Sequence, residues 1–375
     1  MSLIAWMGAI ETGFVYALVA LGVFLSFRIL DFPDLTVDGS FPLGAAVSAT
    51  AIVGGWDPFL STALAFVAGC IAGSITAWLN VRLKILNLLA SILMMIALYS
   101  INLRIMGRPN VALLGERTVL TPFEGLGLPF YLLTPLVFAV VVIAAMILLI
   151  RFLNSEMGLA MRATGANARM ARAQGINTAA MTLLGMALSN GLVAIGGALF
   201  AQSQGSADVT MGVGTIVVGL ASVIGGEAVM STRTIARAII ACLVGAILYR
   251  VAVALALNAG FLGLTASDLN LVTAVLVAAA VVASHLKSTT RGDSAVKAFA
   301  ADRNGTTTLK FWNASSVQSQ VLAADNNGLM MLAFWNASIM QSQALAADRN
   351  GTTTLKYWNA SIMQSQALAA DRNGT

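Results

Sequence analysis

The chain has 375 residues, of which 58% are hydrophobic and only 10% are charged, and its formal net charge is +5. Soluble globular chains carry about a quarter charged residues, so the composition excludes a soluble enzyme and predicts a polytopic membrane protein. The charges gather in short segments, and we expect no nucleic-acid partner. Cys70 and Cys242 lie in apolar runs far apart in the chain, so neither a disulfide framework nor a metal site is expected.

Apolar runs give the expected membrane spans, because a helix needs about 20 such residues to cross roughly 30 Å of hydrocarbon. Nine runs qualify, two of them short: 3–27, 41–53, 59–79, 85–103, 130–152, 179–201, 211–224, 235–257 and 269–286. We therefore expect an all-α bundle of eight or nine transmembrane helices in residues 1–288, a linker over 289–299 and a tail over 300–375. Cytoplasmic loops retain Lys and Arg, and their distribution predicts an external N-terminus and an internal C-terminus.

Both short runs adjoin residues that break helices. The first follows a polar stretch that contains Asp34 and Asp38, and the second is rich in glycine around Gly225 and Gly226. Broken helices at membrane depth are tolerated only where the freed backbone groups face protein or a water-filled cavity, and such pairs often line a transport pathway. Two interpretations stay open: a pathway, or capping aspartates together with tight helix packing.

A basic polar segment over 155–177 separates two long apolar blocks. Asn167 suits a helix N-cap and Gly175 a left-handed C-cap position, which predicts a short helix between them. A second short helix is expected over 156–164, with Gly165 as the break. A basic loop attracted to anionic lipid would need only the charges. The Asn and Gly residues at the expected helix boundaries are not explained by lipid binding, and they favour a segment that docks on another protein at the cytoplasmic side.

Ionisable residues inside the expected spans are functional candidates, because a charge near the bilayer centre costs roughly 2.5–3.5 kcal/mol on insertion scales. Glu11 lies in the first span, Arg250 in the eighth and Asp268 at the start of the ninth. Arg250 and Asp268 either pin two helices together or offer complementary charge to a zwitterionic solute, and the pin is the favoured interpretation. Asn190 is a weaker candidate, since neutral polar groups often form interhelical hydrogen bonds.

The docking segment resembles the Gly-x-Asn-x-x-x-Ala-Arg-x-x-Gly-Ile pattern of permease subunits in ABC importers of the branched-chain amino acid and ribose type. The matching residues are Gly165, Asn167, Ala171, Arg172, Gly175 and Ile176. Residues 34–40 and 224–226 resemble two further stretches of that family. Residues 32–41 and 100–110 are similar to a bacterial subfamily usually described as uncharacterised permease components and sometimes as tryptophan or tyrosine importers. The resemblance covers about residues 1–288.

This resemblance implies a multi-pass permease of the bacterial inner membrane that forms a dimer, with two identical copies expected. It implies a small amino acid-like solute, a periplasmic binding protein that delivers it and an ABC ATPase subunit that drives transport. The segment then forms the coupling helix, with Arg162, Gly165, Asn167, Arg169, Ala171, Arg172, Gly175 and Ile176 expected to dock on the ATPase. The translocation path is expected to include Asp34, Asp38, Asn190, Gly225, Gly226, Arg250 and Asp268.

The chain carries no Gly-x-x-x-x-Gly-Lys-Ser/Thr loop to cradle a nucleotide. We therefore expect it not to be an enzyme and to bind no cofactor itself, ATP being used by the partner subunit. Two other functions stay open. An ion-coupled secondary transporter would rely on Glu11 as its main central carboxylate. A membrane scaffold would serve mainly to carry the tail.

The tail contains three copies of a 23-residue unit, at 300–322, 323–345 and 346–368, and residue 369 begins a fourth. Fixed periods of this kind can build stacked repeats. The unit is polar throughout, however, and has little periodic apolar face. We expect disorder or marginal structure, with a small repetitive β arrangement as the alternative.

Overall fold

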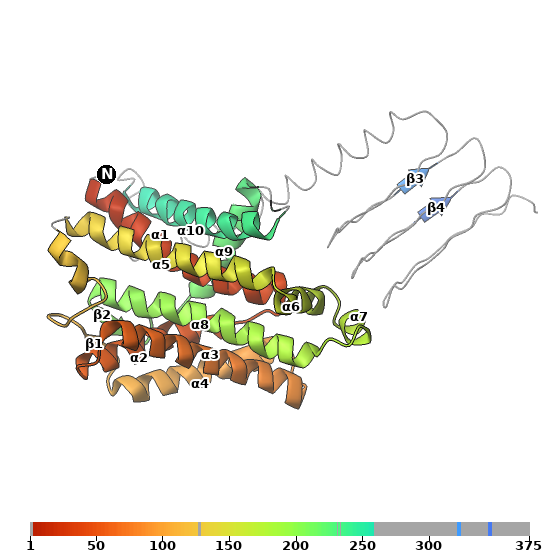
Figure 1. The fold of residues 1–375 in the computed structure, drawn as a ribbon, viewed down its shortest axis with the longest axis horizontal. Coiled ribbons are helices and arrows are strands. Elements are labelled where there is room, and N and C mark those ends of the chain that lie inside the picture. Colours follow the sequence, from red (N-terminus) through yellow and green to blue (C-terminus); the bar gives the residue numbers. More distant parts are fainter. Residues whose placement is uncertain are drawn as a thin grey trace, which may run out of the picture. The chain divides into compact units, whose positions relative to one another are not determined.

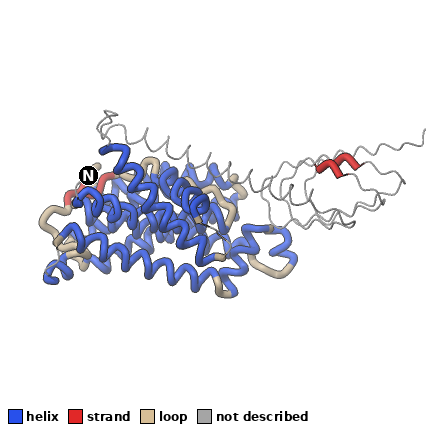
Figure 2. The backbone as a smooth tube through the Cα atoms, turned by 90° about the horizontal axis from the view of Figure 1, so that it is seen from above, coloured by secondary structure: helices blue, strands red, loops and turns tan. Residues whose placement is uncertain are grey.

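The computed structural model describes residues 3–126, 129–230, 232 and 234–258, together with two short strands of the tail. The chain divides into two compact units, Met1–Thr290 and Arg291–Thr375. Within the first unit, long helices run side by side along one direction (Figure 1). Most of its described backbone is helical, and strands occur only as short segments (Figure 2).

The first unit contains ten α-helices, one π-helix and one 3₁₀-helix in its described residues. In chain order they are α1 (Leu3–Val23), the π-helix η1 (Phe24–Ile29), α2 (Val37–Val53), α3 (Pro58–Leu83), α4 (Asn87–Met106), the 3₁₀-helix η2 (Thr121–Leu126), α5 (Phe130–Leu153), α6 (Glu156–Ala166), α7 (Ala168–Ala173), α8 (Thr178–Gln204), α9 (Thr215–Val229) and α10 (Ile235–Asn258). Strands β1 (Asn110–Ala112) and β2 (Ser206–Asp208) pair antiparallel, with Val111 opposite Ala207.

Eight of the nine expected spans coincide with helices. Among the described residues, six stretches are long and apolar enough to cross a membrane: Ala5–Ile29, Pro58–Leu83, Asn87–Met106, Phe130–Leu153, Thr178–Gln204 and Ile235–Ala256. The two short runs form the shorter apolar helices α2 and α9, and the run at 269–286 lies outside the described residues. The expected all-α polytopic membrane fold is confirmed.

The bundle has two recognisable ends, which we call the α6–α7 end and the β1–β2 end (Figure 1). Helix α8 connects them, because it starts after α7 and ends immediately before β2. Caps mark both ends of α8: the Asn177 side chain accepts a hydrogen bond from the backbone NH of Ala180, and Gly205 adopts a left-handed conformation at the other end. Both are common helix-boundary signals.

Helices α1, α2 and α3 pack against α8 at very short backbone distances. A Cβ built on Gly44 would collide with the carbonyl oxygen of Ala194, and one on Gly197 would collide with that of Phe41. Small residues allow such approaches in a bilayer, where van der Waals packing replaces the hydrophobic drive between helices. The abundant glycine of the sequence is thus used where α2 meets α8.

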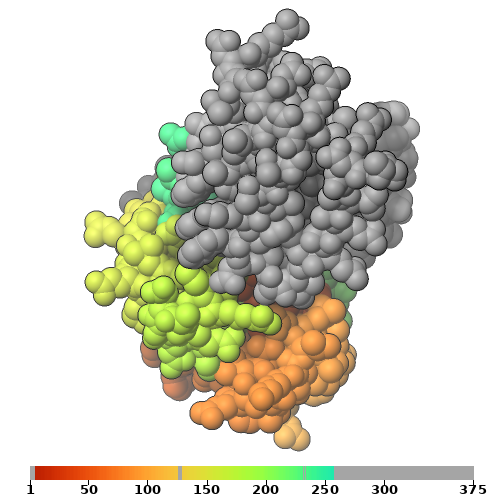
Figure 3. All heavy atoms as spheres, turned by 90° about the vertical axis from the view of Figure 1, so that its right-hand side faces the viewer, coloured from red at the N-terminus to blue at the C-terminus, as the bar shows by residue number. Residues whose placement is uncertain are grey.

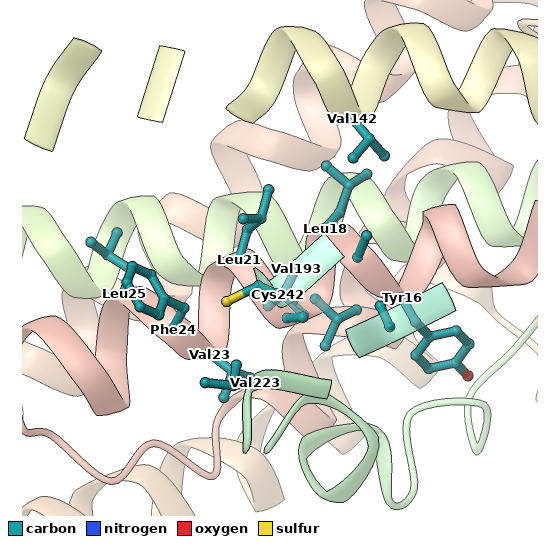
Figure 4. Packing of buried hydrophobic residues seen from close by; sticks show 14 of the residues in the cluster. Tyr16, Leu18, Leu21, Val23, Phe24, Leu25, Val142, Val193, Val223 and Cys242 are labelled. Carbon is teal, nitrogen blue, oxygen red and sulfur yellow. The ribbon is translucent and has the colours of Figure 1, made fainter. Parts of the chain in front are cut away.

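The main apolar core lies among α1, α5, α8, α9 and α10. Figure 4 shows side chains of this core, including Leu18 and Leu21 of α1, Val193 of α8 and Cys242 of α10. Cys242 is fully buried among apolar neighbours, as expected for a small core residue.

Helices α2 and α9 each traverse only part of the bundle. Asp34 and Ser40, at the start of α2, both hydrogen-bond to Asn190 in the middle of α8. From there α2 runs to the β1–β2 end, where its Ile52 packs in a cluster with Val111 and Ala207. Helix α9 also begins beside the start of α2 but runs to the α6–α7 end. The two short helices therefore begin at mid-depth and point in opposite directions.

The described part of the tail consists of β3 (Val321–Ala323) and β4 (Ala344–Ala346), which pair in parallel. Val321 lies opposite Ala344 and Leu322 opposite Leu345. This register equals the 23-residue period of the repeat, so equivalent positions of neighbouring units pair. The pairing agrees with the repetitive β arrangement for these two strands, and the rest of the tail lies outside the described residues.

The contact between α2 and α8 can be tested by replacing Gly44 with Ala. The added methyl group has no room beside Ala194, and overpacking of this kind typically costs about 1–3 kcal/mol. We expect Gly44→Ala to lower the thermal unfolding midpoint of the detergent-purified protein. Gly8→Ala is the matched control, because a Cβ on Gly8 meets nothing within 4 Å and Ala is the better helix former. Equal midpoints for Gly44→Ala and the wild type would contradict the packing described here.

Candidate functional site

A buried polar network lies at the middle of the bundle, where α2 begins. The Asp34 carboxylate accepts hydrogen bonds from the Thr36 backbone NH at 2.9 Å and from Asn190 Nδ2 at 2.7 Å. The Ser40 hydroxyl donates to Asn190 Oδ1 at 2.7 Å, and the Thr36 and Thr76 hydroxyls lie 3.0 Å apart. All five side chains belong to buried residues. The network holds the irregular backbone before α2 against α3 and α8, which is the condition for broken helices in a membrane.

Asp38 joins the beginnings of the two short helices. Its carboxylate accepts from the backbone NH of Ile216 at 2.7 Å and from that of Gly214 at 3.2 Å. It therefore caps α9 from a separate helix and places a negative charge at the positive end of the α9 dipole. The capping interpretation of Asp38 agrees with these contacts, and α2 and α9 also have the broken-helix arrangement that transporters use near their binding sites.

The far end of α9 is joined to η1 by the Arg28–Glu227 ion pair, with Arg28 Nε 2.9 Å from Glu227 Oε1. It is the only ion pair within the described part of the chain. On the neighbouring side, a Cβ on Gly165 of α6 would collide with the carbonyl oxygen of Ile29. Helix α6 thus packs directly on the end of η1, next to the residue that holds α9.

The two glycines of the expected path lie in different environments. A Cβ on Gly226 would collide with the carbonyl oxygen of Ala241, so Gly226 provides close packing between α9 and α10. Gly225 has open space at the equivalent position, with nothing within 4 Å. A part for either glycine in a transport path stays a prediction.

The expected docking segment forms two short helices at one end of the bundle. The Asn167 side chain accepts hydrogen bonds from the backbone NH groups of Arg169 and Met170, at 3.1 and 3.0 Å, and so caps α7. Gly175 follows α7 with φ of 82°, so the predicted cap positions are confirmed. The expected break at Gly165 is wrong: α6 continues to Ala166, and the chain turns at Asn167, where φ is −160°.

The side chains of this segment differ in how far they are available to a partner. Arg169, Met170 and Arg172 are exposed, and Ala171 is buried against the bundle. Asn167 and Gly175 are also exposed, whereas Arg162, Gly165 and Ile176 are partly buried. Figure 3 looks onto this end, where residues of α6 and α7, in yellow-green, lie at the surface.

Met170 was not among the docking residues expected from the sequence. It is 55% exposed between two exposed arginines. An apolar side chain on an exposed helix of otherwise polar and small residues was the available signal. Adjacent residues of a helix point about 100° apart, so Met170 is exposed although its neighbour Ala171 is buried against the bundle.

Two charged residues lie inside helices toward the β1–β2 end. The Ser203 hydroxyl donates a hydrogen bond to the Glu11 carboxylate. The guanidinium carbon of Arg250 lies 3.7 Å from the centre of the Tyr16 ring. The expected partner of Arg250, Asp268, lies outside the described residues. The ion pair expected between them therefore stays a prediction.

The carboxylate of Asp208, at the β1–β2 end, lies outside the spans. The hydroxyl and the backbone NH of Thr210 both donate to it and hold its pKa below the usual range. A lowered pKa means that these bonds stabilise the fold at neutral pH and are lost as the pH falls through the folded-state pKa. No group of three or more potential metal-ligating side chains occurs in the described residues.

A multi-pass helical bundle that contains two oppositely directed short helices and buried polar groups at mid-depth belongs to the class of membrane transport proteins. Residues 7–283 match the family described as "Branched-chain amino acid transport system / permease component". The chain belongs to this permease family, and the resemblance seen in the docking segment is confirmed.

Two relatives cover most of the first unit. The tyrosine transport system permease protein of Clostridioides difficile (strain R20291) is 38% identical over 272 residues, which is 72% of this chain and 88% of that protein. An uncharacterized protein of Rickettsia prowazekii (strain Madrid E) is 34% identical over 258 residues, 67% of this chain and 89% of the relative. A solved structure of PsaBC from Streptococcus pneumoniae in complex with Fab matches with a TM-score of 0.42 at 17% identity, covering 74% of this chain and 89% of the PsaBC chain.

The central network predicts a measurable coupling between Asn190 and Ser40. Asn190→Leu removes the acceptor of Ser40 and a donor to Asp34, and each buried group left unsatisfied costs about 1–3 kcal/mol. We expect Ser40→Ala to destabilise the wild type but to have little further effect once Asn190 is Leu. The free energies of unfolding in detergent of the two single variants and the double variant measure this coupling. Effects that add within about 0.5 kcal/mol would show that the two residues act independently.

Proposed function

We propose that this chain is the membrane-spanning subunit of an ATP-driven importer that moves a small amino acid-like solute across the bacterial inner membrane. The proposal rests mainly on α7. This capped six-residue helix exposes Arg169, Met170 and Arg172 at one end of a protein that belongs to a permease family. The family description and the tyrosine permease among the relatives support an amino acid-like solute.

In this proposal α7 is the coupling helix that enters a cleft on the ATPase subunit. Arg169 and Arg172 provide positive charge for an acidic rim, and Met170 provides an adaptable apolar contact between them. The α6–α7 end is then cytoplasmic, which agrees with the external N-terminus predicted from the sequence. This chain binds no cofactor, and ATP is hydrolysed by the partner.

Movement of the ATPase would reach the mid-depth network through a short series of contacts. Displacement of α7 moves α6, whose Gly165 packs on Ile29 at the end of η1. The adjacent Arg28 holds Glu227 of α9, and the opposite end of α9 is capped by Asp38 of α2. The short helices α2 and α9 then have two arrangements, and each arrangement opens the translocation path to one side of the membrane. ATP binding and hydrolysis shift the equilibrium between these arrangements.

Three further partners belong to the proposal. A periplasmic binding protein delivers the solute to the β1–β2 end, and a second copy of the chain completes a homodimer. Lipid covers much of the apolar surface of α3, α4 and α5, which expose residues such as Ile71, Ile96 and Leu148. In the homodimer, part of this surface is shared between the two copies.

An ion-coupled secondary transporter is the second candidate. The observation in its favour is that the Asp34 carboxylate is fully buried with neutral hydrogen-bond partners and no cationic side chain at salt-bridge distance in the described residues. Buried carboxylates of this kind mark proton and ion pathways in transporters. This candidate leaves α7 without a role, and for that reason we favour the importer.

A pull-down with co-expressed candidate ATPase subunits tests the docking role of α7. We expect the double variant Arg169→Glu/Arg172→Glu to reduce the captured ATPase at least about tenfold, because like charges across an interface cost several kcal/mol. Arg104→Glu is the matched control, since Arg104 is an exposed arginine in the last turn of α4, away from α6 and α7.

The same pull-down separates the two candidate functions. If the double variant and the wild type capture equal amounts of ATPase, α7 is not part of the interface. A correctly inserted wild-type chain that captures no ATPase and accumulates solute without ATP would favour ion-coupled transport.

A further inference from the structure

Three aromatic rings from three different helices meet in the half of the bundle toward the β1–β2 end. Tyr16 of α1 stacks on Phe41 of α2 with ring centres 5.8 Å apart, and Phe200 of α8 lies 6.1 and 5.7 Å from these two rings. Arg250 of α10 places its guanidinium carbon 3.7 Å from the centre of the Tyr16 ring. Four helices thus contribute to one aromatic cluster with a cation on its face.

Arg250 has unused hydrogen-bonding capacity in this position. Among the described residues, its buried Nε has no hydrogen-bond partner, and no carboxylate lies within 4.0 Å of the guanidinium. The cation–π contact with Tyr16 uses no NH group of Arg250, so it leaves the Nε–H available as a donor. A planar guanidinium with free NH groups is suited to bind a carboxylate through two parallel hydrogen bonds.

A carboxylate of the protein lies near the same cluster. Glu11 of α1 accepts a hydrogen bond from Ser203, which is three residues after Phe200 on α8. Residues three apart on a helix are neighbours on one face, so Glu11 approaches α8 one turn from the aromatic rings. A charge inside a span is costly, and both Glu11 and Arg250 are therefore candidates for binding a charged group.

We propose that Arg250, Glu11 and the rings of Tyr16, Phe41 and Phe200 form a binding site for an aromatic amino acid in its zwitterionic form. Arg250 binds the carboxylate, Glu11 binds the ammonium group, and the side chain of the solute packs on the aromatic rings. Since the three rings contact one another in this structure, the solute replaces ring contacts of the protein by equivalent contacts with its own ring.

This inference rests on the proposed import function and specifies the solute class. The alternative for Arg250 is an ion pair with Asp268 that only holds two helices together. The two hypotheses differ in an observable way. A structural pin affects all solutes alike, whereas a binding site affects the preference for solutes that carry a carboxylate and an ammonium group.

Equilibrium binding of radiolabelled tyrosine to the full chain, purified with its ATPase partner and without any binding protein, tests the site. Three competitors report the contacts separately. Tyramine lacks the carboxylate, 3-(4-hydroxyphenyl)propionate lacks the ammonium group, and leucine lacks the aromatic ring. For the wild type we expect each of the three competitors to bind at least about tenfold more weakly than tyrosine.

We expect the variants to change the relative affinities for tyrosine and its competitors in different ways. Arg250→Gln weakens tyrosine binding about tenfold to a hundredfold and removes the preference for tyrosine over tyramine, because a charged hydrogen bond is lost. Arg250→Lys keeps part of that preference. Glu11→Gln removes the preference for tyrosine over the propionate. Arg104→Gln, at an exposed arginine outside the cluster, leaves all preferences unchanged.

ATP-dependent uptake by the same preparation in proteoliposomes, with candidate binding proteins added, separates failure of the site from failure of the function. Uptake that depends on ATP, together with no tyrosine binding or an unchanged order of competitors in Arg250→Gln, overturns the site and leaves the importer intact. An assembled complex that shows no ATP-dependent uptake of any amino acid overturns both.

Discussion

The amide of Asn190 is the interaction on which the rest of the bundle depends. It lies in the middle of α8 and bonds Asp34 and Ser40 on either side of the start of α2. No water is available in the hydrocarbon to satisfy an interrupted backbone, so α2 can begin at mid-depth only where protein groups replace it. Because α2 begins there, Asp38 reaches the first NH groups of α9, and the second short helix is placed by the first.

Close backbone contacts act together with these side-chain bonds to hold the helices of the first unit against one another. Glycines allow α2 to touch α8, α9 to touch α10 and α6 to touch η1, each with a carbonyl oxygen where a side chain would otherwise lie. Such contacts are stiff, since close-packed interfaces transmit displacement instead of absorbing it. The proposed docking of an ATPase on α7 requires this property, because a displacement of α7 must then reach α9 and α2.

Charge is distributed in keeping with the same constraint. Asp38 lies at the positive end of a helix, Asp34 accepts hydrogen bonds from an amide and a backbone NH, and Arg28 pairs with Glu227. Arg250 is the exception within the described residues, because its buried Nε has no acceptor and its guanidinium lies on an aromatic ring. In the proposed binding site, the carboxylate of the solute supplies an acceptor for this cation.

The amino-acid sequence alone determined the membrane class, eight helices and the caps of α7, because apolar runs and Asn or Gly signals act over a few neighbouring residues. It also indicated Asp34, Asp38 and Asn190, since polar groups in apolar surroundings are conspicuous. It did not show that α6 continues past Gly165 or that Gly165 packs on the carbonyl group of Ile29, because that contact joins residues far apart in the chain. Only the tertiary structure decided that Asp38 caps α9 and that Tyr16, Phe41, Phe200 and Arg250 meet. Contacts between residues so far apart depend on how helices pack, and no local pattern records them.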